Sequence, residues 1–574
     1  MQHEVFFKNE EKRILVEEGT TVLEAERLAG LQPDAPCGGQ GSCGKCTVTL
    51  EHGESREEVR ACQWEIHENL TVITGQESRS HAILTQGLQR QIPMKPVILS
   101  GFVKIEKLKL GQALSQWERL RLALEKRFRR DLSGLQPDLE LSSRLYDMLK
   151  KTDTWYVVLG ENRILSMTEE EVPCYGVAVD VGTTSVVGYL MDMATGQVLA
   201  TESRMNPQAQ YGADVIMRCN YAMEHGGEEI SLCIRECLNE ILFSLAKSRG
   251  IETSDIYGIS LVGNTCMHHL LLNLSPKSLA MAPYNPVIRQ QLTLTAGDVG
   301  LKIQEKGQLY LLPNIAGFVG GDTMGCILAT RPDLQEEISL MIDIGTNGEM
   351  VLGSRKAMVT CSTAAGPAFE GAKIQCGMRG AAGAVDHVSY ENGSFHYTTV
   401  GGEKAVGLCG SGLIDLTAAL LKAGYIDESG YLDLEGGGNQ IILVPGPESG
   451  TGEAIFLSQK DIREVQLAKA AIAAGITLLC RELGIGLEDI QKVYIAGAFG
   501  NYMDADSACA IGLIPPELRD KILPIGNAAG EGARIALLSR DELAASRRLS
   551  EKIRFVELAS SPDFQDCFVD ELEF

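Results

Sequence analysis

The strongest constraint on the fold of this chain is a motif that occurs twice. The segment GVAVDVGTTSVVGYL starts at Gly176, and the similar segment LMIDIGTNGEMVLG starts at Leu340. In each, an apolar run leads to an aspartate, then to a Gly-Thr turn, then to a second apolar run. Asp180 and Asp343 lie 163 residues apart, which is the size of a domain. We therefore predict an internal duplication of a large α/β unit rather than a short repeat.

The residues of the two turns indicate phosphate binding. A tight turn of Gly and Thr offers backbone N–H groups and hydroxyls to phosphate oxygens. An aspartate at the end of the strand can hold Mg²⁺, usually through water. Two structural hairpins are the alternative, but the pairing of two such turns behind buried strands favours a nucleotide site. The predicted phosphate-binding residues are Asp180, Gly182, Thr183, Thr184, Asp343, Gly345, Thr346 and Asn347.

A third segment, VYIAGAFGNYMDADSACAIGLIP (493–515), is typical of a strand, a turn at Gly497 and Gly500, and a helix. With the two turns, it resembles the acetate and sugar kinase, heat-shock chaperone and actin superfamily. The resemblance implies two α/β lobes of ribonuclease-H-like topology, with ATP and Mg²⁺ in the cleft between them. It also implies that Gly497 and Gly500 shape the adenosine end of that cleft.

The predicted catalytic residues are Asp180 and Asp343, which would hold the metal, and Glu349, which would position the attacking water. Other glycine-rich segments, such as GFVGGDTMGCI and STAAGPAFEGAKI, allow two interpretations. The glycines serve close packing of strands and helices, or the segments place Asp322 or Glu370 in the cleft.

Four cysteines near the N-terminus form a second site. Cys37, Cys43, Cys46 and Cys62 have the spacing C-x5-C-x2-C-x15-C, with four glycines inside the loop. Four thiolates hold an iron–sulfur cluster, and the plant-type [2Fe–2S] loop has the related order C-x4-C-x2-C…C. Zinc or free thiols are the alternatives, but zinc sites favour two C-x2-C knuckles. We predict an iron–sulfur cluster, either [2Fe–2S] or [4Fe–4S], at these four thiolates.

The segments beside these cysteines support that prediction. VFFKN and RILVEEG are typical of two strands, Thr21 with Glu24 forms a capping box for a helix, and CTVTLEHG and NLTVIT are typical of further strands. Residues 1–78 resemble the β-grasp [2Fe–2S] ferredoxins.

Composition sets limits on location and partners. The chain has 574 residues and a formal net charge of −24, which argues against nucleic acid or an anionic membrane as a partner. It shows neither an export signal nor an apolar run of membrane-spanning length, so we expect a cytoplasmic protein. The fold class is multidomain α/β and α+β. The expected parts are a β-grasp ferredoxin domain (1–78), a linker (79–100), a small middle domain (101–172), and a two-lobed actin-like ATPase domain with lobes 173–340 and 341–574.

The whole chain is similar to the reductive activators of corrinoid-dependent enzymes, through the cysteine loop and the DVGTT, GNT, DIGTNGE, GPAFEG and GAFGNY segments. The resemblance implies ATP-dependent reduction of an inactive Co(II) corrinoid protein to Co(I) in a methyltransferase or O-demethylase system. The implied partners are that corrinoid protein and a low-potential electron donor, and a homodimer is left open. The alternatives are an ATP-dependent electron donor for another low-potential metalloenzyme, such as a radical dehydratase, and a nucleotide-binding redox sensor.

Overall fold

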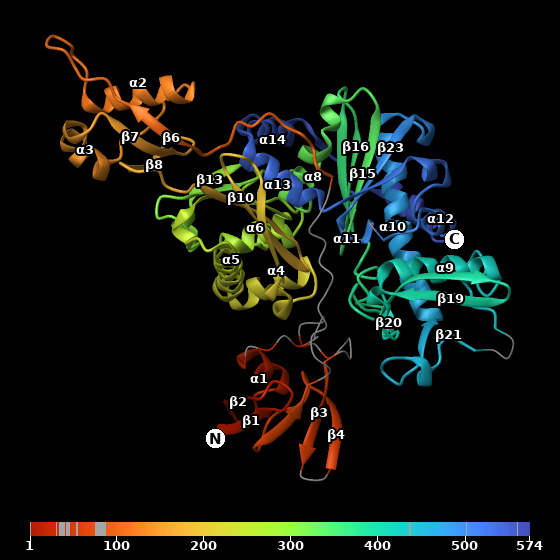
Figure 1. Ribbon diagram of the computed structural model, residues 1–574. Coiled ribbons are helices and arrows are strands. Elements are labelled where there is room, and N and C mark those ends of the chain that lie inside the picture. The colour runs from red at the N-terminus through yellow and green to blue at the C-terminus, as the bar shows by residue number, and fades with distance from the viewer. Residues whose placement is uncertain are drawn as a thin grey trace.

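The chain folds into two small domains and two larger lobes (Figure 1). The computed structural model describes residues 2–29, 31, 33, 39, 41, 46–52, 55–74, 88–434, 438–500, 502–558 and 561–574. In this part of the chain, no helix has the length and apolar character that crossing a membrane requires.

The N-terminal domain is a five-stranded sheet in the order β2-β1-β5-β3-β4, with helix α1 (Val22–Leu28) packed on it. Central strands β1 and β5 run parallel, and the other neighbours run antiparallel. Thr21 and Glu24 form the predicted capping box at the start of α1. The β-grasp arrangement expected from the sequence is confirmed. The strands are β1 (Gln2–Phe7), β2 (Lys12–Glu17), β3 (Thr47–His52), β4 (Ser55–Arg60) and β5 (Leu70–Ile73).

The second small domain is an antiparallel sheet covered by two helices. Strands β6 (Leu99–Lys104), β7 (Thr154–Leu159) and β8 (Ile164–Thr168) form the sheet, in that order. Helices α2 (Gln116–Phe128) and α3 (Leu139–Lys151) bury leucines, including Leu120, Leu124 and Leu145, against Trp155 and Val157 of β7. The buried leucines lie on one face of each helix, so both helices are core elements of this domain.

The two lobes repeat one sheet topology, which explains the duplicated motif. In the first lobe, β9 pairs antiparallel with β10 and parallel with β12, and in the second lobe β15 pairs antiparallel with β16 and parallel with β23. Both sheets therefore share the order third-second-first-fourth, followed by one more parallel strand, which is β14 in the first sheet and β24 in the second. This is the ribonuclease-H-like topology expected from the sequence. The first sheet consists of β11 (Val198–Met205), β10 (Ser185–Asp192), β9 (Tyr175–Val181), β12 (Ile256–Gly263), β14 (Gln308–Leu311) and β13 (Leu292–Thr295). The second consists of β24 (Ile522–Gly526), β23 (Ile490–Ala496), β15 (Ile338–Ile344), β16 (Gly348–Gly353), β17 (Met358–Thr363) and β25 (Arg554–Phe555).

Helices cover both sheets, and the second lobe carries a subdomain of small sheets. Long helices α5 (Glu228–Arg249) and α10 (Gln459–Leu483) pack on the first and second sheet, respectively. The small sheets contain β18 (Ala384–Glu391), β19 (Ser394–Thr399) and β20 (Gly407–Leu408), and β21 (Gln440–Val444) with β22 (Ile455–Ser458). The other helices are α4 (Val215–His225), α6 (Thr265–Leu271), α7 (Lys277–Ala280), α9 (Gly410–Ala423), α11 (Gly497–Gly500), α12 (Ala505–Ala510) and α15 (Pro562–Asp570).

One pair of helices joins the lobes. Helix α13 (Ala528–Leu538) follows β24 of the second sheet, yet it packs against α8 (Gly321–Thr330) and against β9 and β12 of the first sheet. A Cβ atom added at Gly325 of α8 would lie 2.7 Å from the carbonyl oxygen of Ala529, and one added at Gly532 would collide with the backbone of Gly325. The backbones of α8 and α13 are therefore in direct contact. By sequence position α13 falls in the range 341–574 expected for the second lobe, but its packing is on the first.

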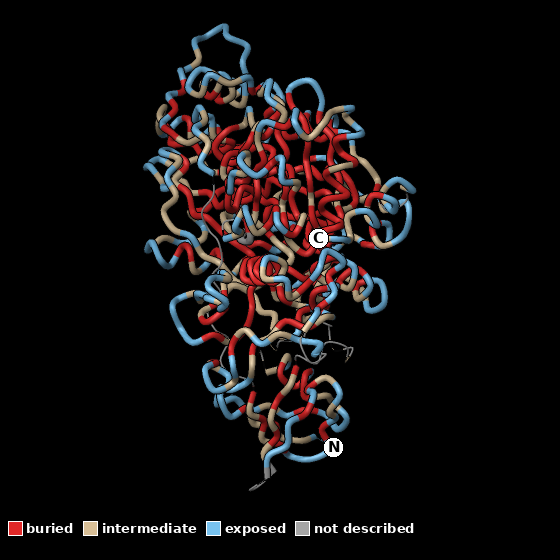
Figure 2. The backbone as a smooth tube through the Cα atoms, turned by 90° about the vertical axis from the view of Figure 1, so that its right-hand side faces the viewer, coloured by how far each residue is buried: buried red, intermediate tan, exposed pale blue. Residues whose placement is uncertain are grey.

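The hydrophobic core reflects this connection. Separate buried clusters fill the first and the second lobe, and a third cluster contains residues of both sheets together with α8 and α13. Buried residues are concentrated in this two-lobed body (Figure 2). The lobes therefore share part of one core rather than meeting only at a linker.

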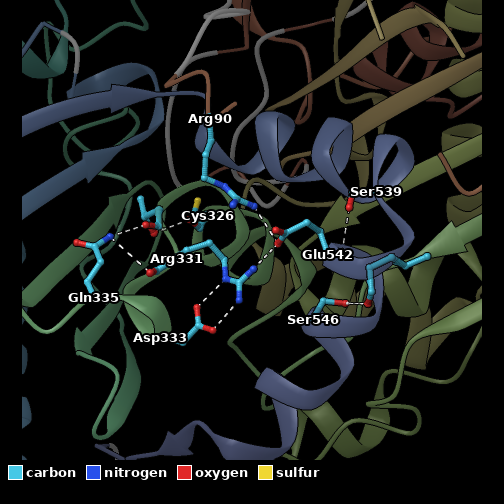
Figure 3. A network of polar contacts seen from close by, with 10 residues as sticks. Arg90, Cys326, Arg331, Asp333, Gln335, Ser539, Glu542 and Ser546 are labelled. Atoms are coloured by element: carbon cyan, nitrogen blue, oxygen red, sulfur yellow. Dashed lines mark hydrogen bonds and ion pairs between the residues drawn. The ribbon is translucent and has the colours of Figure 1, made fainter. Parts of the chain in front are cut away.

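An ion network fixes the C-terminal end of α8 (Figure 3). Arg331 follows α8 and donates two hydrogen bonds to Asp333, at 2.7 and 2.8 Å, and a third to Glu542 of α14 (Arg540–Lys552). Arg90 pairs with the same carboxylate oxygen of Glu542 at 2.8 Å. Because Arg331 and Glu542 are mostly buried, this network is weakly screened by water. It joins α8, α14 and the segment that leads from the N-terminal domain.

We predict that Glu542→Gln lowers the free energy of unfolding by about 1–3 kcal/mol, because Arg90 and Arg331 both lose a charged acceptor. Calorimetry should show a fall of a few degrees in the unfolding midpoint. Glu551→Gln, an exposed position on the same helix, is the matched control and should leave the midpoint unchanged. Equal midpoints for the two variants would contradict this role for the network.

Candidate nucleotide and cluster sites

The first predicted phosphate turn, residues 182–184, lies between β9 and β10 and is held from behind by three side chains. The Asn206 amide donates to the carbonyl of Gly182 at 2.8 Å. The Asn264 amide donates to the Thr183 hydroxyl at 3.0 Å, and the Arg218 guanidinium donates to the Thr183 carbonyl at 2.6 Å. These partners come from three separate segments, so the tertiary fold sets the shape of this turn.

Arg218 is the most unusual of these side chains because its charge is buried. Its other donors reach the Gly212 carbonyl at 2.9 Å and the Met267 sulfur at 3.3 Å. Within the described residues, no carboxylate lies within 4.0 Å of its guanidinium, and burial lowers its pKa to about 10. Buried charges are normally paired, so a cation directly behind the turn favours an anion in front of it. The sequence analysis did not identify Arg218, since an arginine inside an amphipathic helix carries no local signal.

The second predicted turn, residues 345–347, lies between β15 and β16 in the same relation to the second sheet. Asp343 of β15 is directly opposite Glu349 of β16, so the two carboxylates share one end of this strand pair.

In both turns, some backbone N–H groups make no hydrogen bond to a backbone carbonyl. Among the described residues, the N–H groups of Thr183, Thr184, Thr346 and Asn347 donate to no backbone carbonyl. Such groups can bind phosphate oxygens.

Four carboxylates gather at the base of the two turns. Burial, with added repulsion from Asp322, raises the pKa of Asp180 and of Asp343 to about 7. Burial likewise raises the pKa of Asp322 to about 6, and it raises the pKa of Glu349 well above its usual value, with added repulsion from Asp322 and Asp343. Asp322 comes from the start of α8, and its charge acts on the carboxylates beside both turns. The interpretation that placed Asp322 in the cleft is therefore confirmed.

This group of carboxylates has the chemistry of a cation site that needs a second ligand. Within the described residues, no three His, Cys, Asp or Glu side chains are arranged to hold a metal ion by themselves. Mg²⁺ commonly uses one or two carboxylates together with water and substrate phosphates. Asp180 and Asp343, each at the carboxyl end of a first strand, fit that mode of binding.

Glu370 joins the two turns. Its carboxylate accepts a hydrogen bond from the Thr184 hydroxyl at 3.1 Å on one oxygen and from the Thr346 hydroxyl at 2.9 Å on the other. The two threonines belong to opposite lobes, so this single side chain spans the cleft. The interpretation that placed Glu370 in the cleft is confirmed.

The two glycines predicted at the adenosine end lie in α11, directly after β23. Gly497 has φ +85°, and a Cβ atom there would lie 3.0 Å from Oδ1 of Asp343. A Cβ atom at Gly500 would lie 2.9 Å from the carbonyl oxygen of Ile495. Both positions therefore need glycine for the close approach of α11 to the second sheet. A contact with adenosine stays a prediction.

Two of the four predicted cluster ligands lie in the described part of the N-terminal domain. Cys46 precedes β3 and is buried, and Cys62 follows β4 and is half-buried. The Ala61 N–H donates to the Cys46 carbonyl at 2.7 Å, which ties the two cysteine segments together. Cys37 and Cys43 lie outside the described residues.

The glycines of the cysteine loop fit closely against this pair. Gly39 has φ +99°, and a Cβ atom there would lie 3.2 Å from Leu23 and 3.9 Å from the Cys62 Cβ. Gly41 has φ +72°, and its added Cβ would lie 2.5 Å from the Gln63 amide nitrogen. Side chains are therefore excluded where the loop approaches Cys62, as expected of a chain that wraps a cluster.

The match to family models agrees with this division of the chain. Residues 5–69 match the 2Fe-2S iron-sulfur cluster binding domain. Residues 175–335 match the RACo middle region, and residues 337–574 match the C-terminal domain of RACo, the ASKHA domain. The chain therefore combines a cluster-binding domain with a nucleotide-binding fold of the acetate and sugar kinase, heat-shock and actin class. The region that the family calls its middle corresponds to the first lobe.

Full-length relatives make the assignment specific. The chain is 35% identical over 589 residues to the corrinoid activation enzyme RamQ of Eubacterium limosum, with 98% of each chain covered. It is 29% identical over 433 residues to a [Co(II) methylated amine-specific corrinoid protein] reductase of Methanosarcina barkeri, covering 70% of this chain and 77% of that one. A solved structure of a reductive activator for corrinoid, iron-sulfur protein matches with a TM-score of 0.75 and 34% identity, covering 100% and 98%. The chain belongs to the family of reductive activators of corrinoid proteins.

We predict that Gly39→Ala lowers the iron content of the anaerobically purified protein. The new methyl group meets Leu23 and adds strain at a positive φ beside Cys62. Gly19→Ala is the matched control, because Gly19 has φ +86° but nothing within 4 Å of an added Cβ. Iron analysis and the visible spectrum should separate the two variants. Full iron in both would contradict a close fit of the loop at Gly39.

We also predict that the nucleotide-free protein loses stability as pH rises from about 4 to about 7. Asp180 and Asp343 keep their protons up to about pH 7 when folded, whereas the unfolded chain releases them near 3.8. Over that interval the unfolded state binds fewer protons, so the free energy of unfolding falls as pH rises and then levels off.

The variant Asp322→Asn tests this prediction. It removes one raised carboxyl and the repulsion that it exerts on the others, so its unfolding midpoint should fall less steeply across the same pH range. Asp298→Asn, at an exposed position, should follow the wild type. Parallel curves for Asp322→Asn and the wild type would contradict coupling among these carboxylates.

Proposed function

We propose that this protein is an ATP-dependent reductase that returns an inactive Co(II) corrinoid protein of a methyltransferase system to Co(I). The observation that carries the proposal is that one chain contains both a cluster-binding domain and two Gly-Thr turns bridged by Glu370, in a family of corrinoid activators. Reduction to Co(I) is energetically uphill for a one-electron donor. Nucleotide hydrolysis supplies the missing free energy when it changes the conformation in which donor and acceptor meet.

Each predicted site has a role in this proposal. Cys37, Cys43, Cys46 and Cys62 hold a [2Fe–2S] cluster, which supplies a one-electron carrier. Asp180 and Asp343 bind Mg²⁺ through water, and the turns at 182–184 and 345–347 bind the phosphates, with Arg218 supporting the first turn from behind. Glu349, directly opposite Asp343, orients the attacking water. Gly497 and Gly500 shape the adenosine end. An external low-potential donor reloads the cluster after each turnover.

We predict that Cys43→Ser abolishes corrinoid activation but leaves nucleotide binding unchanged, because the cysteines and the phosphate turns lie in separate domains. Titration with a nucleotide and an anaerobic activation assay, followed by the loss of the Co(II) absorption band, measure the two properties. Cys174→Ser is the control, since the half-buried Cys174 precedes β9, at the opposite end of that strand from the turn at 182–184. A wild-type protein without iron would refute the proposed electron carrier.

ATP hydrolysis should be stimulated by a Co(II) corrinoid protein and not by the same protein in its Co(III) methylated state. Asp343→Asn should reduce hydrolysis at least about a hundredfold, because it removes a group that holds the metal at the reacting phosphate. Phosphotransfer to a small molecule would instead place the protein among kinases. Equal corrinoid reduction with and without ATP would refute the energetic role of the nucleotide.

A further inference from the structure

Glu370 occupies a position with consequences for nucleotide binding. Its two carboxylate oxygens take the hydroxyls of Thr184 and Thr346, one from each turn. A carboxylate and a phosphate are both anionic acceptors of hydrogen bonds, and hydroxyls in such turns are typical phosphate donors. In this structure, therefore, a side chain of the protein makes contacts that the proposed function assigns to a phosphate group.

The segment that carries Glu370 is built to present it there. Ala368 and Phe369 are buried in the core of the second lobe. Behind them the chain turns sharply: Glu370 N–H donates to Pro367 at 3.1 Å, and Gly371 N–H donates to Ala368 at 2.9 Å. Gly371 has φ +76°, and a Cβ atom there would lie 2.5 Å from the backbone nitrogen of Met378. The backbone on both sides of Glu370 is thus fixed, and its side chain is aimed at the cleft.

The surrounding charges do not pair with Glu370. Among the described residues, no Lys, Arg or His lies within 4.0 Å of its carboxylate. The buried Arg218 acts on Glu370 only at longer range, from behind the first turn. The other acidic groups of the cleft, Asp180, Asp322 and Asp343, are of the same sign. Within the described part of the chain, the hydrogen bonds from the two threonines are therefore the contacts that keep this carboxylate in the cleft.

We propose that Glu370 is a latch that a nucleotide phosphate displaces. This inference rests on the proposed nucleotide function. Without nucleotide, the carboxylate bridges Thr184 and Thr346 and holds the lobes together. A phosphate that enters needs the same hydroxyls and repels the carboxylate, so binding releases the Glu370 side chain and loosens the turn at residues 367–371 that carries it. Nucleotide affinity is reduced by the cost of this release.

The first test is nucleotide affinity, measured by calorimetry with a non-hydrolysable β,γ-imido analogue of ATP and Mg²⁺. Glu370→Ala should bind the analogue at least about tenfold more tightly than the wild type, because two charge-assisted hydrogen bonds no longer compete. Glu370→Gln should show a smaller gain, since its amide still accepts but carries no charge. Glu391→Ala, at an exposed position of β18, is the control and should bind like the wild type.

A double-variant cycle separates a latch from a general change in charge. In the Thr184→Val, Thr346→Val background, the gain from Glu370→Ala should shrink to less than about threefold, because the hydroxyls are already gone. A full gain in that background would overturn the proposal. Unchanged or weaker binding by both Glu370→Ala and Glu370→Gln would also overturn it.

Hydrogen exchange provides a structural readout. Saturation with the analogue should increase amide exchange in residues 367–371 of the wild type. The same segment of Glu370→Ala should already exchange quickly without nucleotide. Equal exchange in all four samples would contradict the latch. If neither the wild type nor Glu370→Ala binds the analogue, the proposed nucleotide function fails as well, whereas tight wild-type binding with no gain in the variants refutes the latch alone.

Discussion

Unbalanced negative charge at the base of the cleft is the constraint around which the two lobes are arranged. Asp180, Asp322, Asp343 and Glu349 come from both sheets and from α8. Burial raises the pKa of each, and the charge of Asp322 adds repulsion on the other three. In the described structure no lysine or arginine forms an ion pair with any of them. Such an arrangement costs free energy, which a bound cation would offset. In the proposed function, a nucleotide with its metal ion provides that cation, together with phosphates that suit the turns above it.

The other features of the site follow from this constraint. Asn206, Asn264 and Arg218 fix the first turn, so its unused N–H groups are already in place before a ligand arrives. Glu370 holds the first turn to the second in the absence of phosphate. In the N-terminal domain the charge to be stabilised is that of a cluster with its thiolates, and glycines bring the backbone close to Cys62. One chain therefore contains two preorganised sites, one for an electron carrier and one for an anion with its metal.

Much of this could be predicted from the sequence because the signals are local. Each of the two turns is a short run of neighbouring residues, as is the capping box at Thr21. The four cysteines likewise fall within one short stretch of the chain. Strand β4 was not predicted, since SREEVR is a charged edge strand in which Val59 is buried. Arg218 and Asn206 became recognisable only when distant segments met behind the first turn. The packing of α13 on the first sheet likewise depends on contacts with residues far away in the sequence, and no pattern within the helix indicates which sheet it covers.

The close contact between α8 and α13 limits how the lobes can move. At Gly325 and Gly532 the two backbones touch. On both sides of this contact, the side chains of α8 and α13 are buried in the core that the lobes share. Sliding either helix along its axis would drive a side chain into the opposite main chain, whereas a small rotation about the contact point leaves the glycines in register. A change in the angle between the lobes is therefore compatible with this contact, whereas a sliding movement of one lobe along the other is not.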